Sequence, residues 1–266
     1  VPKGNIKYKF EKDGYPSVER LVNVRNSFSI SFNKGEVSTG EMIFIENKET
    51  KLRTAGLDHL NNEKVGDYYI DKFEVSFKEF EEYLAANPKQ YPTITGWVDR
   101  KARPDMLNKP VFGFQWKRCK KYCEWKGKRL PTEAEWERAA KGIDGRNYPW
   151  GNEPPDDNRA NFGNCCFIQK GSVLSPVYSF DNGKSPEGVY NLGGNVAEWV
   201  HDWYDKKYYE KSPYKNPKGP VKGKHHVIRG GAWNSLPVYL RSSSRYGDSD
   251  AKDYYGIGCR CAKNAD

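Results

Sequence analysis

A glycine-rich segment in the C-terminal half carries oxygen-bearing side chains at a spacing that could bind a metal ion. Asn191, Gly194, Asn195 and Glu198 place carboxamide and carboxylate oxygens among glycines, with Trp199 close behind. Oxygen donors in a glycine-bent turn suit a hard cation such as Ca²⁺. The alternative is a turn capped by Asn side chains and followed by core aromatics, and on chemistry alone the residues favour it.

The residue types that could do other chemistry are not arranged for it. A nucleophilic set of Ser242, His201 and Asp202 lacks the strand–turn–helix motif that exposes a catalytic serine. The adjacent His225 and His226 precede an expected strand, and such a pair is more typical of a surface loop than of a metal site. The sequence contains no P-loop and no dinucleotide-binding fingerprint.

The six cysteines occur in three pairs, which are Cys119 and Cys123, Cys165 and Cys166, and Cys259 and Cys261. The first pair shares a helix face and the last a strand face, so the two faces could dock. A disulfide such as Cys123–Cys261 would close a loop of well over a hundred residues, a stabilisation of ~4–5 kcal/mol. A Cys₄ zinc site matches the usual ligand spacing poorly, and buried free thiols are the third interpretation. We favour at least one disulfide and therefore an exported protein.

Composition predicts one large domain and a small appendage. The chain has 266 residues, of which 36% are hydrophobic and 14% aromatic, so the core must rest on rings. The net charge is +9, but the lysines are scattered among acids, which argues against a nucleic-acid partner. No stretch approaches the ~18–20 apolar residues of a membrane span. Because the chain begins at Val1 and not at an initiator methionine, we expect a trimmed product. An export signal and a lipid anchor would lie upstream of Val1.

Hydrophobic periodicity divides the chain near residue 40. Alternating strands at residues 6–10 and 28–33 predict a small β-rich appendage over residues 1–40. The main domain, residues 41–266, begins with strands at 41–46 and 67–75. Three helices follow: one capped by Ser76, one ending at Gly127, and one opened by a capping box of Thr132 and Glu135. Beyond Gly142 we expect loops broken by short strands at 176–180 and 226–229.

Seven segments in register resemble the formylglycine-generating enzyme/sulfatase-modifying-factor family, a variant of the C-type lectin fold. They are residues 41–45, 69–75, 116–136, 148–152, 188–203, 227–233 and 258–262. The resemblance implies an α+β, C-type lectin-like domain with two central helices, a small twisted antiparallel sheet and many ordered loops. It also implies a disulfide between Cys123 and Cys261.

The resemblance further implies a structural Ca²⁺ ion at the glycine-rich segment. The ion would take side-chain oxygens from Asn191 and Glu198 and backbone oxygens from Gly194 and Val196.

The family's oxidase chemistry requires a copper(I)-binding cysteine pair that this sequence does not have. The two cysteines lie five residues apart, after an Arg-Gly-Gly-x-Trp turn, and thiolates suit the soft ion. Here Pro237 and Ser242 occupy those positions. We therefore expect no copper, no catalytic residues and no enzyme.

The segment in place of the family's active-site face is rich in Tyr, Ser, Gly and Asp, like an antibody paratope. It is similar to the C-terminal segment of the variable proteins of diversity-generating retroelements, which include a treponemal surface lipoprotein. An ordinary polar loop on an inactive family member is the alternative. The predicted ligand-binding residues are Asn234, Ser235, Leu236, Pro237, Val238, Tyr239, Ser244, Tyr246, Gly247, Asp248, Asp253, Tyr254 and Tyr255.

Together these observations predict a non-enzymatic protein at the cell surface or outside the cell, anchored to the outer membrane. It would display a diversified C-terminal face to a protein or carbohydrate ligand on another cell or surface. The alternative function is an oxidase or maturation factor of the formylglycine-generating type, acting on a protein or a small molecule.

Overall fold

The computed structural model describes residues 5–10, 18–23, 41–46, 48–52, 61–92, 95–164, 173–249 and 256–265. The chain divides into two compact units, residues 1–38 and 39–266, close to the division predicted at residue 40. In the first unit, β1 (Asn5–Phe10) pairs antiparallel with β2 (Val18–Asn23). The strand predicted at residues 28–33 lies outside the described residues.

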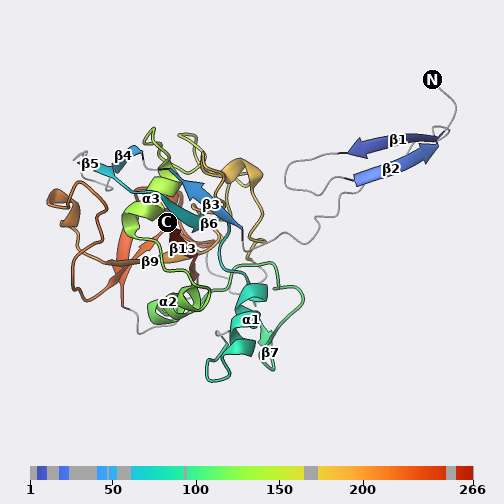
Figure 1. Ribbon diagram of the computed structural model, residues 1–266, viewed down its shortest axis with the longest axis horizontal. Coiled ribbons are helices and arrows are strands. Elements are labelled where there is room, and N and C mark those ends of the chain that lie inside the picture. Colours follow the sequence, from blue (N-terminus) through green and yellow to red (C-terminus); the bar gives the residue numbers. More distant parts are fainter. Residues whose placement is uncertain are drawn as a thin grey trace. The chain divides into compact units, whose positions relative to one another are not determined.

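The second unit contains three α-helices within its described part: α1 (Phe77–Ala86), α2 (Trp116–Trp125) and α3 (Glu133–Lys141) (Figure 1). The predicted cap at Ser76 and the predicted capping box of Thr132 and Glu135 are both present, and Ser76 also forms a capping box with Glu79. No described helix is long and apolar enough to cross a membrane.

Two sheets form the frame of this unit. The antiparallel one has the order β13 (Ala262–Asn264), β6 (Tyr68–Asp71), β3 (Met42–Ile45). The other has the order β11 (Arg245–Asp248), β10 (His226–Arg229), β9 (Ala197–Trp203), β12 (Ile257–Gly258). The predicted small antiparallel sheet is therefore present, and the second sheet is mixed, because β12 pairs parallel with β9. The α+β class is confirmed.

Short elements complete the described part. Two small hairpins join β4 (Glu49–Leu52) to β5 (Asn61–Lys64) and β7 (Trp97–Val98) to β8 (Lys101–Ala102). Three 3₁₀ turns follow: η1 (Asp181–Gly183), η2 (Tyr208–Glu210) and η3 (Pro237–Leu240). The strand predicted at residues 176–180 was wrong, because the Ser179 amide donates to the Pro176 carbonyl and closes a turn there.

Aromatic side chains fill the core, as the composition predicted. One buried cluster surrounds Phe80, which contacts Phe114 edge-on at a ring-centroid distance of 4.7 Å. A second cluster holds α3 between the two sheets, since Trp136 packs with Ile70 of β6 and Val227 of β10. Leu192 of the glycine-rich segment belongs to the same cluster, so this packing also positions that segment.

Candidate functional site

The glycine-rich segment Asn191–Glu198 forms a tight, buried turn that enters β9. Asn191 and Asn195 have φ values of 54° and 61°, in the left-handed region, and Gly194 has 92°. A Cβ on Gly194 would lie 2.5 Å from the Asn161 carbonyl oxygen, so this position requires glycine. The turn therefore holds its polar groups against the protein interior and not toward solvent.

Glu198, a predicted Ca²⁺ ligand, forms a buried ion pair with Arg260. The Arg260 Nη2 atom lies 2.6 Å from Glu198 Oε1, and its Nε lies 2.8 Å from Oε2. Trp136 Nε1 donates to Oε2 at 2.7 Å. Both charged side chains are essentially inaccessible, so the forked geometry of the pair compensates their desolvation.

Glu74, which no sequence motif indicated, lies directly beside this pair. Its Oε2 accepts hydrogen bonds from Asn191 Nδ2 at 2.8 Å and Asn195 Nδ2 at 3.1 Å. Burial raises the pKa of Glu74 to about 8; Arg260 opposes that shift and Glu198 adds to it. The available signal was an acid between Phe73 and Val75, in a segment expected to be an alternating strand.

The donor set is chemically compatible with Ca²⁺, because Glu198 Oε1 accepts a bond from Arg260 and a carboxylate oxygen can accept two. An ion bound there would share the carboxylate with the guanidinium, and Asn191, Gly194 and Val196 would supply the remaining oxygens. Within the described ranges, no group of three or more His, Cys, Asp and Glu side chains forms a metal cluster. The Ca²⁺ site stays a prediction.

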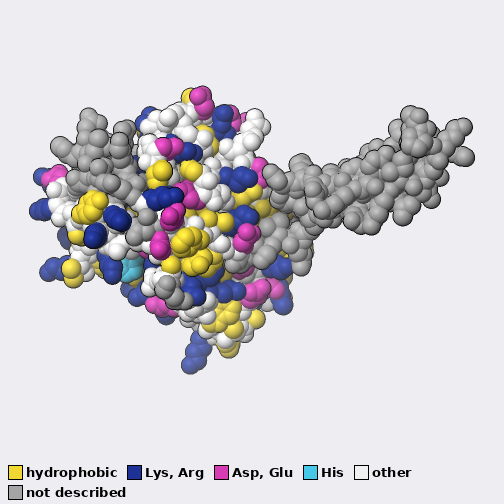
Figure 2. Space-filling view, turned by 45° about the horizontal axis from the view of Figure 1, so that its top comes forward, with side chains coloured by type: hydrophobic (Ala, Val, Ile, Leu, Met, Phe, Trp, Pro, Cys, Tyr) yellow, Lys and Arg dark blue, Asp and Glu magenta, His cyan; other side chains and the backbone are white. Residues whose placement is uncertain are grey.

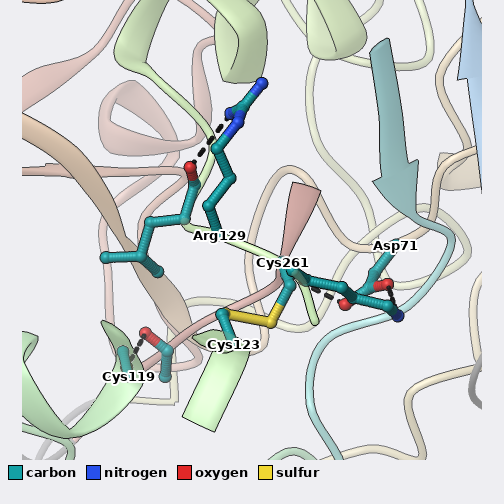
Figure 3. The surroundings of a disulfide bond; sticks show 8 residues. Asp71, Cys119, Cys123, Arg129 and Cys261 are labelled. Carbon is teal, nitrogen blue, oxygen red and sulfur yellow. Dashed lines mark hydrogen bonds and ion pairs between the residues drawn. A yellow bond between two sulfur atoms is a disulfide. The ribbon is translucent and has the colours of Figure 1, made fainter. Parts of the chain in front are cut away.

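The predicted disulfide is confirmed. Cys123 of α2 is bonded to Cys261 over a sequence separation of 138, with 5.6 Å between the Cα atoms (Figure 3). A zinc site of four cysteines is therefore wrong for these two residues. Cys119 and Cys259 are buried free thiols, and Cys165 and Cys166 lie outside the described residues.

The C-terminal face is built on η3, which follows the Arg-Gly-Gly-Ala-Trp turn after β10. Leu236, Val238 and Tyr239 are 64%, 53% and 49% exposed. The two positions that correspond to the family's cysteine pair are Pro237, which is exposed at the start of η3, and Ser242, which is fully buried. These two side chains offer no sulfur ligand for a copper ion.

Hydrogen bonds within the segment 232–244 hold this exposed turn in place. Ser244 Oγ donates to the Val238 carbonyl at 2.7 Å, and the Tyr239 amide donates to the Leu236 carbonyl at 3.0 Å. The Ala232 amide donates to Ser235 Oγ at 2.9 Å. The backbone of the face is therefore fixed, while its apolar side chains point outward.

A buried charge network lies beneath the face. Arg229 of β10 donates to Glu133, Glu137 and the Ser242 carbonyl, at 2.9, 2.5 and 2.5 Å. Arg245 of β11 donates to both carboxylate oxygens of Glu133, at 2.6 and 2.7 Å. Each arginine thus connects a strand next to the face with α3.

The other predicted contact residues differ in exposure. Asn234 is exposed, while Tyr246, Gly247 and Asp248 of β11 are partly buried. Burial raises the pKa of Tyr246 well above its usual range, and Asp248 and Tyr239 add to the shift. Ser244 is buried and acts as a support. Three further residues, Asp253, Tyr254 and Tyr255, lie outside the described residues.

Comparison with known proteins identifies the family. The model of the sulfatase-modifying factor enzyme 1-like domain matches residues 27–265. The chain belongs to this family. It is 34% identical to the serine/threonine-protein kinase pkn1 of Chlamydia pneumoniae over 84% of this chain and 38% of that protein. It is 37% identical to the formylglycine-generating enzyme of Streptomyces coelicolor over 62% of this chain and 57% of that enzyme.

A solved structure, Treponema denticola variable protein 1, has the same fold. Its TM-score is 0.64, with 21% identity over 84% of this chain and 95% of that one. The predicted C-type lectin-like fold of the formylglycine-generating type is thus confirmed. The chain spans less than two thirds of the length of the two curated relatives.

Proposed function

We propose that this domain is a non-enzymatic binding module whose ligand contacts the η3 face. The supporting observation is that three neighbouring apolar side chains, of Leu236, Val238 and Tyr239, are about half exposed or more on a backbone held by hydrogen bonds. Exposed apolar side chains on a fixed backbone bind a partner at low conformational cost. Tyrosine in particular is enriched among residues that dominate binding energy.

The residues at the two positions of the family's copper-binding cysteines, Pro237 and Ser242, support a role other than oxidation. A proline cannot ligate copper(I), and a fully buried serine hydroxyl is neither soft nor accessible. The proposed module therefore uses the former active-site face for contact and not for catalysis. The Ca²⁺ ion proposed at Asn191–Glu198 would be structural, because that turn enters β9 and is buried.

We further propose that the face is diversified between copies of the gene, and that the protein acts at the cell surface or outside the cell. The support is the Tyr-, Ser- and Gly-rich composition of residues 234–256 and the fold shared with Treponema denticola variable protein 1. On the side of the molecule shown in Figure 2, basic and acidic side chains of the described residues are interspersed. The exposed side chains of Leu236, Val238 and Tyr239 on the η3 face carry no charge, so a neutral or mixed ligand fits this face better than a polyanion. The ligand would be a protein or a carbohydrate on another surface.

Substitutions on the face test this proposal. The folded chain is screened on a printed glycan array and against a displayed library of protein domains, and the binder obtained is used with variants. Tyr239→Ala should weaken binding at least ~10-fold, whereas Tyr91→Ala, another exposed tyrosine far from η3 in sequence, should leave it unchanged. Equal loss in both variants would contradict the proposed face.

A second assay addresses the enzymatic alternative. Oxygen consumption is measured with copper(I) and a cysteine-containing peptide. Copper-dependent turnover by the wild-type chain would overturn the proposal. Sequencing the gene and its neighbourhood supplies an independent test, because diversification requires a reverse transcriptase and a near-copy of the codons for residues 234–258.

A further inference from the structure

Two free thiols lie side by side next to the disulfide. Cys119 of α2 and Cys259, in the extended segment between β12 and β13, are both fully buried. Cys119 Sγ donates to the carbonyl oxygen of Gly258, the neighbour of Cys259, at 3.8 Å, and the two thiols lie close enough to influence each other's pKa. Cys119 and Cys123 both lie on α2, and Figure 3 shows Cys119 in the surroundings of the disulfide.

The spacing of the four cysteines sets the two pairs in register. Cys119 precedes Cys123 by four residues on a helix, a rise of about 6 Å. Cys259 precedes Cys261 by two residues of extended chain, which span nearly the same distance, ~6.6 Å. The thiol pair is therefore displaced from the disulfide by an equal step along both elements, and it faces the same partner segment.

We propose that Cys119 and Cys259 form a second disulfide when the chain folds in an oxidising environment. The thiolate of one cysteine attacks a low-molecular-weight disulfide such as oxidised glutathione, and one glutathione thiolate leaves. The other cysteine then attacks this mixed disulfide and releases the second glutathione thiolate. The protein loses two thiol protons and two electrons, and the oxidant becomes two thiols.

Burial decides when this reaction takes place. The thiolate is the reactive form, and desolvation raises the pKa of Cys119 and of Cys259 in the folded chain. Oxidation therefore occurs before α2 packs, and a domain that has folded with both thiols reduced stays reduced. The two cross-links also close loops of nearly equal length, so either one holds α2 to the C-terminal segment.

Peptide mapping of the wild-type chain tests the proposal directly. The chain is refolded in excess oxidised glutathione, its remaining thiols are alkylated after denaturation, and it is digested with trypsin. Cleavage after Lys120 and after Arg260 places the four cysteines on four different peptides. We expect a linked peptide pair for Cys119–Cys259 in addition to Cys123–Cys261. Alkylated Cys119 and Cys259, or crossed pairs such as Cys119–Cys261, would overturn the proposal.

A variant without the first disulfide gives a second readout. In the double variant Cys123→Ser and Cys261→Ser, refolded under the same conditions, Cys119–Cys259 should form and the Tm should fall on reduction. The matched control, Cys119→Ser with Cys259→Ser, should keep only Cys123–Cys261. A double variant in which both Cys119 and Cys259 are alkylated, and whose Tm is unaffected by reductant, would contradict the proposal, whatever its stability.

Discussion

Glu74 gives the sharpest test of the buried site, because its ionisation is coupled to folding. Its pKa is about 8 in the folded chain, against 4.5 for an unperturbed glutamate. At pH values between 4.5 and about 8, Glu74 is therefore protonated in the folded state and ionised in the unfolded state. Glu74 contributes its full stabilisation below about pH 4.5, and this contribution is lost as the pH rises through about 8.

The size of the effect follows from the same interval. From 4.5 to about 8, at about 1.4 kcal/mol per pH unit, the upper limit is about 5 kcal/mol. Relaxation around the carboxylate, which accepts bonds from Asn191 and Asn195, reduces this limit. We expect the substitution Glu74→Gln to change the pH dependence of the free energy of unfolding by at least about 2 kcal/mol between pH 5 and pH 9.

Urea unfolding of the wild type and Glu74→Gln at both pH values, with EDTA present and the disulfide intact, measures this change. Burial also raises the pKa of Asp71 and Asp202, but both residues are present in both proteins and their contributions cancel in the difference. The variant should be less pH-sensitive and relatively more stable at pH 9. Parallel pH profiles for the two proteins would refute the coupling.

Three further predictions concern the frame and the turn. Arg260→Met leaves Glu198 buried without its cation and should lower the free energy of unfolding by about 3–5 kcal/mol. Arg260→Lys keeps a positive charge and should lose less stability. A loss under ~1 kcal/mol in Arg260→Met would contradict the role of the ion pair. Thr132→Ala should lower the free energy of unfolding by about 1 kcal/mol through loss of the α3 cap, whereas Thr132→Ser should change it very little. Thermal unfolding of the two variants measures this difference. Adding Ca²⁺ after EDTA treatment should raise the Tm, because binding at 100 times the Kd adds about 2.7 kcal/mol to the free energy of unfolding. Asn191→Ala should abolish this increase. A Tm that does not change with Ca²⁺ would contradict the proposed site.

The elements that were predicted correctly depend on residues close together in the sequence. The cap at Ser76 and the capping box of Thr132 and Glu135 depend on residues close together in the sequence, so they can be recognised without the fold. The disulfide between Cys123 and Cys261 required more, because helix and strand spacing showed only that two thiol faces could dock. The resemblance to a family supplied the pairing.

Partners distant in sequence could not be predicted. Glu74 meets the turn at Asn191 across more than a hundred residues, and the parallel pairing of β12 with β9 depends on where the chain returns. His226 illustrates the same limit. It was expected in a surface loop, yet it is buried and stacked between Trp116 and Trp203, with 3.7 Å to each ring centroid.

The candidate face separates positions that can vary from positions that must support them. Leu240 and Ser242 are fully buried, and the Ser242 carbonyl accepts a bond from Arg229, so the backbone below η3 is anchored to α3. The side chains of Leu236 and Tyr239 are exposed. The hydrogen bond between these two residues joins the Tyr239 amide to the Leu236 carbonyl, so it involves only the backbone. Exchanging exposed side chains therefore changes the contact surface with little effect on folding, which is the physical requirement for a surface that recognises different ligands on one scaffold.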